Sequence, residues 1–449
     1  MKLNKLKKYI ILFLLLILFI LSSKILYERK SAYDSIYLEL KEIEGYTKKT
    51  SFAIGDSIPV YLHTTKLAKA QVFRISTKAT FIKDFNISKK NQENIYNPQK
   101  GFDWTESFKF STKGLKEGFY YLKIEQVDSP NNYTYIPFLI HSKLTPRIAV
   151  IASTNTWQAY NEYGGNSFYK HHNTSIINKL LYKRFPSLKP IDYLPFNRPY
   201  HYIKDELDNI VSTIEEINIP QGTDYYNEDV NIGSHLIKGE LNLIGFLEKS
   251  NYDYNVYSDL YFERNIIESE IIIFNTHSEY WSEEMIGRLE RLKKLGKKII
   301  FASGNNIYRS VEYYEWGVMV NRNPEYTRFK TTKTCGAYYT EITYPKTSAF
   351  KVEQNNHWVF NNTKLKKEDI FGEFGASGNE TDKIGFGSKD YTVLAVGTNS
   401  AGPAYMIIDE YENGGWLFNA SSIMFPKGLQ RDPVITQIMK NLLRKDSIK

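Results

Sequence analysis

The sequence predicts an N-terminal membrane helix, an immunoglobulin-like β-sandwich and a doubly wound α/β domain. Three features of the 449 residues support this order. A lysine-rich start precedes a long apolar run, short alternating segments separated by turn residues follow, and the second half contains wholly apolar segments of strand length. We therefore expect a basic flank and membrane segment at 1–30, the sandwich at 34–142 and the α/β domain at 146–449.

Residues 1–30 have the layout of an export signal. Four lysines precede an apolar run over residues 9–21, and extending this run to Tyr27 gives the roughly 20 residues that a membrane-spanning helix needs. No Ala-x-Ala-like cleavage site follows, which favours an uncleaved anchor. The basic flank should stay in the cytoplasm, so the main domains should lie outside it. The alternative is a secreted or periplasmic protein released by cleavage.

Charge and cysteine content exclude some functions. The chain carries +8, and residues 1–30 hold seven Lys/Arg and one Glu, or +6, which leaves only +2 for the rest. That distribution argues against a nucleic-acid partner. Cys335 is the single cysteine, so the fold has no intramolecular disulfide.

Residues 34–142 predict short strands. Gly55 and Asp56 separate the first two, and a Ser-Pro-Asn-Asn turn at 129–132 separates the last two. Many short strands with frequent turn signals indicate a β-sandwich. This region has no clustered catalytic set, so a structural or binding role is expected. The strands are predicted over 51–54, 58–63, 70–75, 108–111, 118–127 and 133–141.

The region after Pro146 predicts a parallel sheet. Residues 270–275 and 298–303 are apolar strands, and between them lies a helix with Ser282 as N-cap and Gly296 at its end. A strand, helix and strand in this order form a βαβ unit. The pattern indicates a flavodoxin- or glutamine-amidotransferase-like domain. It also includes strands over 147–153 and 252–257, helices over 236–247 and 433–443, and strands with long loops over 320–400.

Ligands of open parallel sheets bind outside the carboxyl ends of the strands. Polar and aromatic residues follow predicted strands at 154–161, 275–281 and 304–306, and a fourth such segment is 195–200. These segments are therefore the candidates for a site.

His277 and Glu279 are the sharpest pair, because an imidazole beside a carboxylate suits metal binding or acid–base chemistry. The alternative is that Glu279 caps the following helix and His277 is a satisfied loop residue. Asn305 either donates to a substrate carbonyl or stabilises a Gly-Asn turn. Tyr160 and Tyr200 are weak candidates alone, since the chain has 35 tyrosines.

These segments resemble the large (beta) subunit of N,N-dimethylformamidase and its relatives. The resemblance covers most of the chain beyond residue 40. The matching stretches are TNTWQAYNEYGGNSFY at 154–169, FNRPY at 196–200, NTHSEYWS at 275–282, FASGNNIY at 301–308 and GGWLFNASS at 414–422, with EGYTKKTSFAIGDSI at 44–58 in the sandwich.

The resemblance implies a single iron, held by two tyrosines and one glutamate, in a site that hydrolyses a small amide. Carried over, Glu279 is the carboxylate ligand and Tyr160 and Tyr200 are the phenolates, with Tyr202 as a substitute for Tyr200. His277 matches a histidine beside the metal that acts as a base or orienting group. Such hard anionic oxygen donors suit ferric iron.

The sequence thus predicts an exported, iron-dependent hydrolase of a small amide, with a membrane as its other partner. A second hypothesis is a non-catalytic cell-envelope protein that binds or assembles a surface glycan, because aromatic strand ends suit sugars as well. A third is an amidotransferase-like scaffold without activity. Ser278 stands where relatives commonly carry Asp, which affects how the metal surroundings would be tuned.

Overall fold

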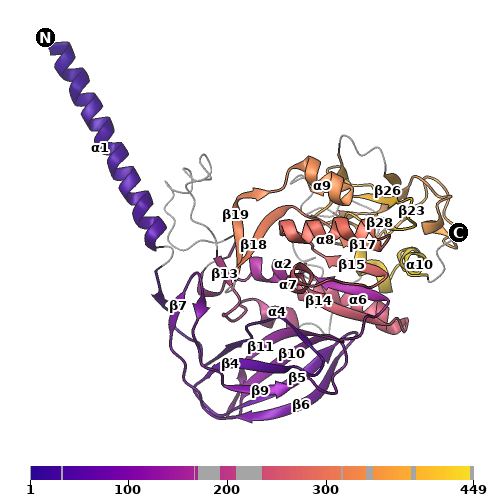
Figure 1. The fold of residues 1–449 in the computed structure, drawn as a ribbon, viewed down its shortest axis with the longest axis horizontal. Coiled ribbons are helices and arrows are strands. Elements are labelled where there is room, and N and C mark those ends of the chain that lie inside the picture. The colour runs from indigo at the N-terminus through magenta and orange to yellow at the C-terminus, as the bar shows by residue number, and fades with distance from the viewer. Residues whose placement is uncertain are drawn as a thin grey trace.

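The computed structural model describes residues 2–31, 34–165, 167–169, 193–208, 235–314, 317–339, 347–385 and 391–444. A long N-terminal helix projects away from the body of the molecule, in which a β-sandwich packs against a larger mixed sheet with its helices (Figure 1).

The first helix, α1 (Lys2–Ser31), is apolar along most of its length. The segment Lys8–Tyr27 has a mean hydropathy of 2.7 and none of it is buried against the rest of the protein. It is long and apolar enough to cross a membrane. By length and composition alone, a helix of this kind at the N-terminus is compatible with a signal anchor or a signal peptide.

Two facing sheets form the sandwich. The larger has the strand order β3 (Ser51–Ala53), β11 (Ser129–His141), β10 (Gly118–Gln126), β5 (Ala68–Ile75) and β6 (Ala79–Ile87). The smaller has the order β2 (Ile43–Tyr46), β4 (Ser57–Thr64) and β9 (Phe108–Ser111). A short sheet of β1 (Ile36–Tyr37), β7 (Ile95–Asn97) and β8 (Gly101–Phe102) lies beside them.

Side chains that alternate between buried and exposed along several strands form the sandwich core. Over residues 57–62 of β4 the buried side chains are Ile58, Val60 and Leu62, two residues apart, as a strand with one buried face requires. The larger sheet is also covered on its second face, because alternate residues of β10 and β11 join the core of the following domain. The sandwich therefore shares a hydrophobic core with the following domain and is not joined to it by a linker alone. These second-face residues are Phe119, Tyr121, Tyr135 and Leu139.

A nine-stranded sheet dominates the remaining chain. Its first five strands are parallel: β14 (Tyr254–Ser258), β12 (Ile148–Ala152), β15 (Ile271–Thr276), β17 (Lys298–Ser303) and β28 (Trp416–Asn419). The next four are antiparallel: β27 (Tyr405–Glu410), β26 (Thr392–Gly397), β22 (Phe350–Val352) and β23 (Ile370–Phe371).

The predicted doubly wound α/β domain is wrong, because strands hold 37% of the residues and helices 25%, and the large sheet is mixed. The predicted βαβ unit is present as β15, α8 (Glu283–Lys294) and β17. Strands β26, β27 and β28 follow one another through short connections, which reverse the chain, whereas parallel strands need long crossovers. The sequence between residues 320 and 400 lacks the helical pattern that such crossovers require.

Smaller sheets and helices complete the fold. The sheets are β13 (Tyr193–Pro195), β19 (Gly317–Glu325), β18 (Arg309–Tyr314) and β16 (Tyr280–Trp281), then β20 (Ala337–Tyr339) with β25 (Asp382–Ile384), and β21 (Thr347–Ser348) with β24 (Ser377–Gly378). The helices are α2 (Thr154–Ala159), η1 (Tyr163–Gly165), α4 (Ile203–Asp208), α6 (Ile237–Lys249), α7 (Asp259–Arg264), α9 (Arg328–Cys335), η3 (Trp358–Phe360), η4 (Phe425–Gln430) and α10 (Pro433–Leu442).

Both faces of the parallel strands are covered. In β12, Ile148 and Val150 join the core that contains α6 and α10, while Ala149 and Ile151 join the core that contains α8. This double burial explains why the strand is apolar throughout. The predicted N-cap is confirmed, since Ser282 Oγ accepts a hydrogen bond from the Met285 amide at 3.1 Å.

Two buried acids hold the start of α2, which follows β12. Asp259 accepts a hydrogen bond from the Asn155 amide at 2.8 Å, and Glu240 accepts from the Ser153 amide at 3.1 Å. Glu240 also accepts from Trp157 Nε1 at 2.8 Å. The Ser153 side chain makes no capping bond, so acids from α6 and α7 stabilise the helix terminus instead. They fix where the chain leaves β12.

The contact between sandwich and sheet predicts a measurable loss of stability. Arg74 of β5 pairs with Glu248 of α6, and both side chains are mostly buried. Glu248→Ala leaves the guanidinium with the Glu117 carbonyl but without its carboxylate partner, so the free energy of unfolding should fall by about 2 kcal/mol. Denaturant unfolding checks this, with Glu368→Ala, which breaks an exposed pair to Lys351, as the matched control. Equal effects of the two substitutions would contradict the assignment.

Asp259 predicts a pH dependence of stability. Burial raises its pKa to about 7, although its hydrogen bonds from Asn155 and Thr154 oppose the shift. In the unfolded chain the pKa of an aspartate is about 3.9. Between the two pKa values the folded state therefore binds one more proton than the unfolded state. The free energy of unfolding then falls as the pH rises, by at most about 1.4 kcal/mol per pH unit. Asp259→Asn should flatten this slope between pH 5 and 7. Urea unfolding at several pH values tests it, and an unchanged slope, as expected for the exposed control Asp253→Asn, would refute it.

Candidate functional site

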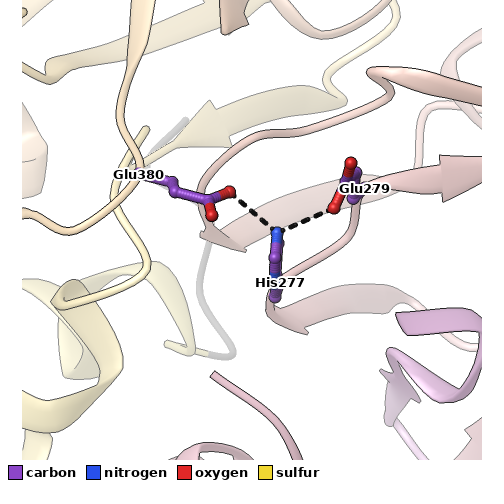
Figure 2. Close-up of side chains that lie close together, drawn as sticks. All are labelled: His277, Glu279 and Glu380. Carbon is purple, nitrogen blue, oxygen red and sulfur yellow. Dashed lines mark ion pairs between the residues drawn. The ribbon is translucent and has the colours of Figure 1, made fainter. Parts of the chain in front are cut away.

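Three ionisable side chains meet at the carboxyl end of β15. His277 and Glu279 lie in the connection from β15 to β16, and Glu380 comes from the segment between β24 and β25 (Figure 2). His277 Nε2 lies 3.2 Å from Glu279 Oε2 and 2.9 Å from Glu380 Oε2. One ligand atom of each residue lies within 4.8 Å of the other two. This His277–Glu279–Glu380 group is the candidate site.

The group is held almost entirely away from water. The His277 side chain is fully buried, and those of Glu279 and Glu380 are 2% and 13% exposed. Burial opposes a charged imidazole, but the two carboxylates outweigh it and raise the pKa of His277 to about 10. Burial likewise opposes a charged Glu380, but His277 and Asn305 stabilise the carboxylate and hold its pKa below the usual value. Without a metal, the proton held on His277 therefore offsets part of the negative charge of Glu279 and Glu380.

The two ring nitrogens of His277 differ in their contacts. Nε2 contacts a carboxylate oxygen of Glu279 and of Glu380, whereas Nδ1 has no hydrogen-bond partner among the described residues. The two carboxylates thus face one positive charge at Nε2, and a cation between them would supply the same charge.

Glu279 is fixed on several sides. Its carboxylate lies 3.4 Å from Arg309 Nε and accepts a hydrogen bond from the Tyr169 hydroxyl at 3.3 Å. Its carbonyl oxygen accepts from the amides of Tyr308 and Arg309, both at 3.0 Å. The alternative in which Glu279 caps the following helix does not match these contacts, since Ser282 fills that role. The side chain points into the group instead (Figure 2).

Tyr160, the C-cap residue that follows α2, belongs to the surroundings of this group. Its ring centroid lies 4.5 Å from that of Tyr169, 4.5 Å from that of His235 and 6.1 Å from that of His277. Burial, and then the charges of Glu380 and Glu279, raise its pKa well above the usual value. The phenol therefore stays protonated unless a cation compensates the nearby acids.

Tyr200 is not brought to the group. Its hydroxyl accepts a hydrogen bond from Gln158 Nε2 at 2.7 Å and also bonds the Thr50 side chain. No contact of the described residues joins it to Glu279 or His277. Tyr202, the predicted substitute, donates to the carbonyl of Trp157 at 2.9 Å. In this structure both tyrosines support α2, so their ligand role stays a prediction.

Asn305 forms a hydrogen bond with Glu380 in this structure. Its Nδ2 donates to Glu380 Oε2 at 2.7 Å, while Oδ1 is buried without a partner among the described residues. Asn305 has a positive φ of 52°, and Thr276 and Ile307 have 54° and 53°. Positive φ values are uncommon for non-glycine residues, above all for β-branched ones. In proteins such strained backbone conformations are frequent at functional sites.

Sequence reasoning missed Glu380, Tyr169 and His235. Glu380 follows no apolar strand, so the rule that selects strand ends could not find it. Tyr169 lies within the matching stretch 154–169, yet only the fold shows its hydroxyl against Glu279 and Tyr280. His235 has a pKa lowered to about 3 by burial and by charged His277, and no motif surrounds it.

The donors present fit a metal ion of the kind that the resemblance implies. Glu279 and Glu380 supply carboxylate oxygens, His277 an imidazole nitrogen and Tyr160 a nearby phenol. Carboxylate and phenolate are hard donors and imidazole suits iron, so the set is compatible with iron. Ser278 does not touch the group through its hydroxyl, which accepts from Trp281 Nε1 at 2.9 Å.

One of the comparisons with known proteins identifies a family. A family model described as N,N-dimethylformamidase beta subunit-like, C-terminal, matches residues 70–439. No curated protein matches the chain. Among solved structures, a Thermoplasma acidophilum protein assigned to GMP synthase is 10% identical, with a TM-score of 0.27, and the match covers 44% of this chain and 82% of that one.

The CARDB domain of a Pyrococcus furiosus protein is 11% identical, with a TM-score of 0.14, and the match covers 23% of this chain and 92% of that one. Likenesses this remote carry no argument about function. The family model, in contrast, begins within the sandwich at residue 70 and covers the whole large sheet. The chain belongs to the N,N-dimethylformamidase beta subunit-like family.

Proposed function

We propose that this protein is an exported, metal-dependent hydrolase that cleaves a small amide into a carboxylic acid and an amine. The observation that supports this most directly is the convergence of His277, Glu279 and Glu380, which lie up to 103 residues apart in the chain, around one buried point. Family membership supports the same reaction class, since the family is dimethylformamidase-like.

Glu279 and Glu380 would hold the metal, which we propose to be ferric iron, with Tyr160 as a further donor. When bound, the metal would polarise the amide carbonyl and make a neighbouring water more acidic. Two carboxylates and a phenol lie around this point, and Arg309 pairs only with Glu279, so the remaining positive charge must come from protonated His277 or from a cation. A cation therefore suits the site electrostatically.

The chain's own residues would manage the protons. His277 Nε2 lies between the two carboxylates, so it can hold a proton there and pass it to the departing amine. Asn305 keeps Glu380 in place through its Nδ2, and Arg309 does the same for Glu279. The surroundings of Tyr160 keep its phenol protonated without a metal, so this residue would lose its proton when the metal binds.

Metal content tests the proposal. Glu279→Gln and Glu380→Gln should each lower the iron bound per chain and abolish amine release from a panel of small formamides and acetamides, because each removes a charged oxygen donor. Mass spectrometry of the purified full-length protein measures the metal. Glu284→Gln, an exposed carboxylate on α8, is the control. Iron retained in both site variants would contradict the proposed centre.

The same assay distinguishes the contributions of Tyr160 and Tyr200 to metal binding. As the structure stands, Tyr160→Phe should reduce metal binding and Tyr200→Phe should not, because only Tyr160 lies beside the acids. The ligand set implied by the resemblance requires both variants to lose metal. Loss in Tyr200→Phe would show that Tyr200 turns into the site.

We also propose that α1 anchors the protein, with its basic flank in the cytoplasm and its main domains outside. The intact mass of protein extracted from cell membranes should then include residues 1–30, and deletion of Lys8–Tyr27 should keep the protein out of the membrane fraction. A mature protein that begins after the apolar segment would instead show a cleaved signal peptide.

A further inference from the structure

A second cleft lies where the sandwich meets the β14–α7 edge of the large sheet. Its volume is about 660 Å³, within the range of small-molecule sites. Residues from both parts line it, including Thr50 and His141 from the sandwich and Tyr257 and Tyr261 from the sheet edge. None of His277, Glu279, Glu380 and Tyr160 lines it, so it is separate from the candidate site.

One wall of the cleft is aromatic. Tyr257 and Tyr261 stack with ring centroids 4.6 Å apart, and His141 lies 4.6 Å from Tyr261. Phe196 and Tyr314 also line the cleft. Flat aromatic faces of this kind accept the C–H faces of sugar rings and other planar groups.

The cleft is positively charged. It contains the four basic side chains Lys48, Lys49, Lys143 and Arg264, against two acids, Asp56 and Glu268. Asp56 is occupied within its own turn, where its carboxylate accepts a hydrogen bond from the Ala53 amide at 2.9 Å. Among the described residues, no carboxylate lies within ion-pair distance of Lys49 or Lys143, and both are exposed. An anionic ligand would neutralise them.

Hydroxyl groups complete the lining. Thr50, Ser142, Thr145 and Ser258 contribute to it, together with Ser51 and Ser269. Thr145 is exposed, and Thr50 and Ser142 are partly exposed. Hydroxyl-bearing side chains with accessible surface can hydrogen-bond a polar molecule in the cleft.

We propose that this cleft binds a short acidic oligosaccharide, with carboxylates facing the lysines, ring faces against Tyr261 and ring hydroxyls against Ser142 and Thr145. The combination favours a sugar acid over a bare phosphate compound, because the aromatic wall would add nothing to binding of phosphate alone. The proposal does not depend on the hydrolase assignment, since the two sites share none of the residues that carry either argument.

Calorimetric titration of the full-length protein in detergent tests it with three probes: trigalacturonic acid, neutral maltotriose and tripolyphosphate. Trigalacturonic acid should bind, and maltotriose should bind more weakly. The double variant Lys49→Glu/Lys143→Glu should weaken trigalacturonate binding by at least about tenfold. The exposed control Lys109→Glu should leave it unchanged.

Tyr261→Leu separates a sugar site from a general anion site. It should weaken binding of trigalacturonic acid and leave any binding of tripolyphosphate unchanged. Thermal melts establish that each variant is folded. Equal affinity for trigalacturonic acid and maltotriose, tripolyphosphate binding as tightly as the sugar acid, or undiminished binding by the lysine variant would each overturn the proposal.

Discussion

The burial of two carboxylates around one imidazole is the constraint on which the centre of this molecule depends. Removing an ion from water costs several kcal/mol even after relaxation, so Glu279 and Glu380 are stable in their positions only with positive charge beside them. His277 supplies that charge between them, and Arg309 supplies more on the far side of Glu279. This balance leaves a place where a cation could substitute for a proton.

The fold directs several remote segments to that point. β15 ends at Thr276, immediately before His277, and β17 ends before Asn305, which contacts Glu380. The α2 helix is joined to the same loop, because Thr156 Oγ1 donates to the His277 carbonyl at 2.7 Å. Parallel strands bring their carboxyl ends to one edge of the sheet, and here that edge collects the polar side chains.

The sandwich packs directly against the domain that carries the candidate site. Its larger sheet is buried on both faces, and the hydroxyl of Tyr163, after α2, donates to Glu44 of β2 at 2.6 Å. The segment that carries Tyr160 is thus held from the sandwich side as well. Packing of this kind gives the site its position and also creates the second cleft at the junction.

Local patterns in the sequence determined much of this protein. The apolar N-terminal helix, the alternating strands of the sandwich, the βαβ unit from Ile271 to Ser303 and the Ser282 cap follow from periodicity and capping chemistry, which act over a few residues. His277 and Glu279 could be selected because they follow a recognisable buried strand. The family followed from ordered short motifs.

Only the tertiary structure decided the rest. The antiparallel half of the large sheet depends on which strands pair, and pairing is a long-range choice that periodicity does not encode. Glu380 joins the site from 101 residues beyond Glu279, through a segment without a strong pattern of its own. Tyr200, in a matching motif, instead bonds Gln158 and Thr50. A motif specifies which residue is present, whereas the direction of its side chain is set by the packing of neighbours far away in the chain.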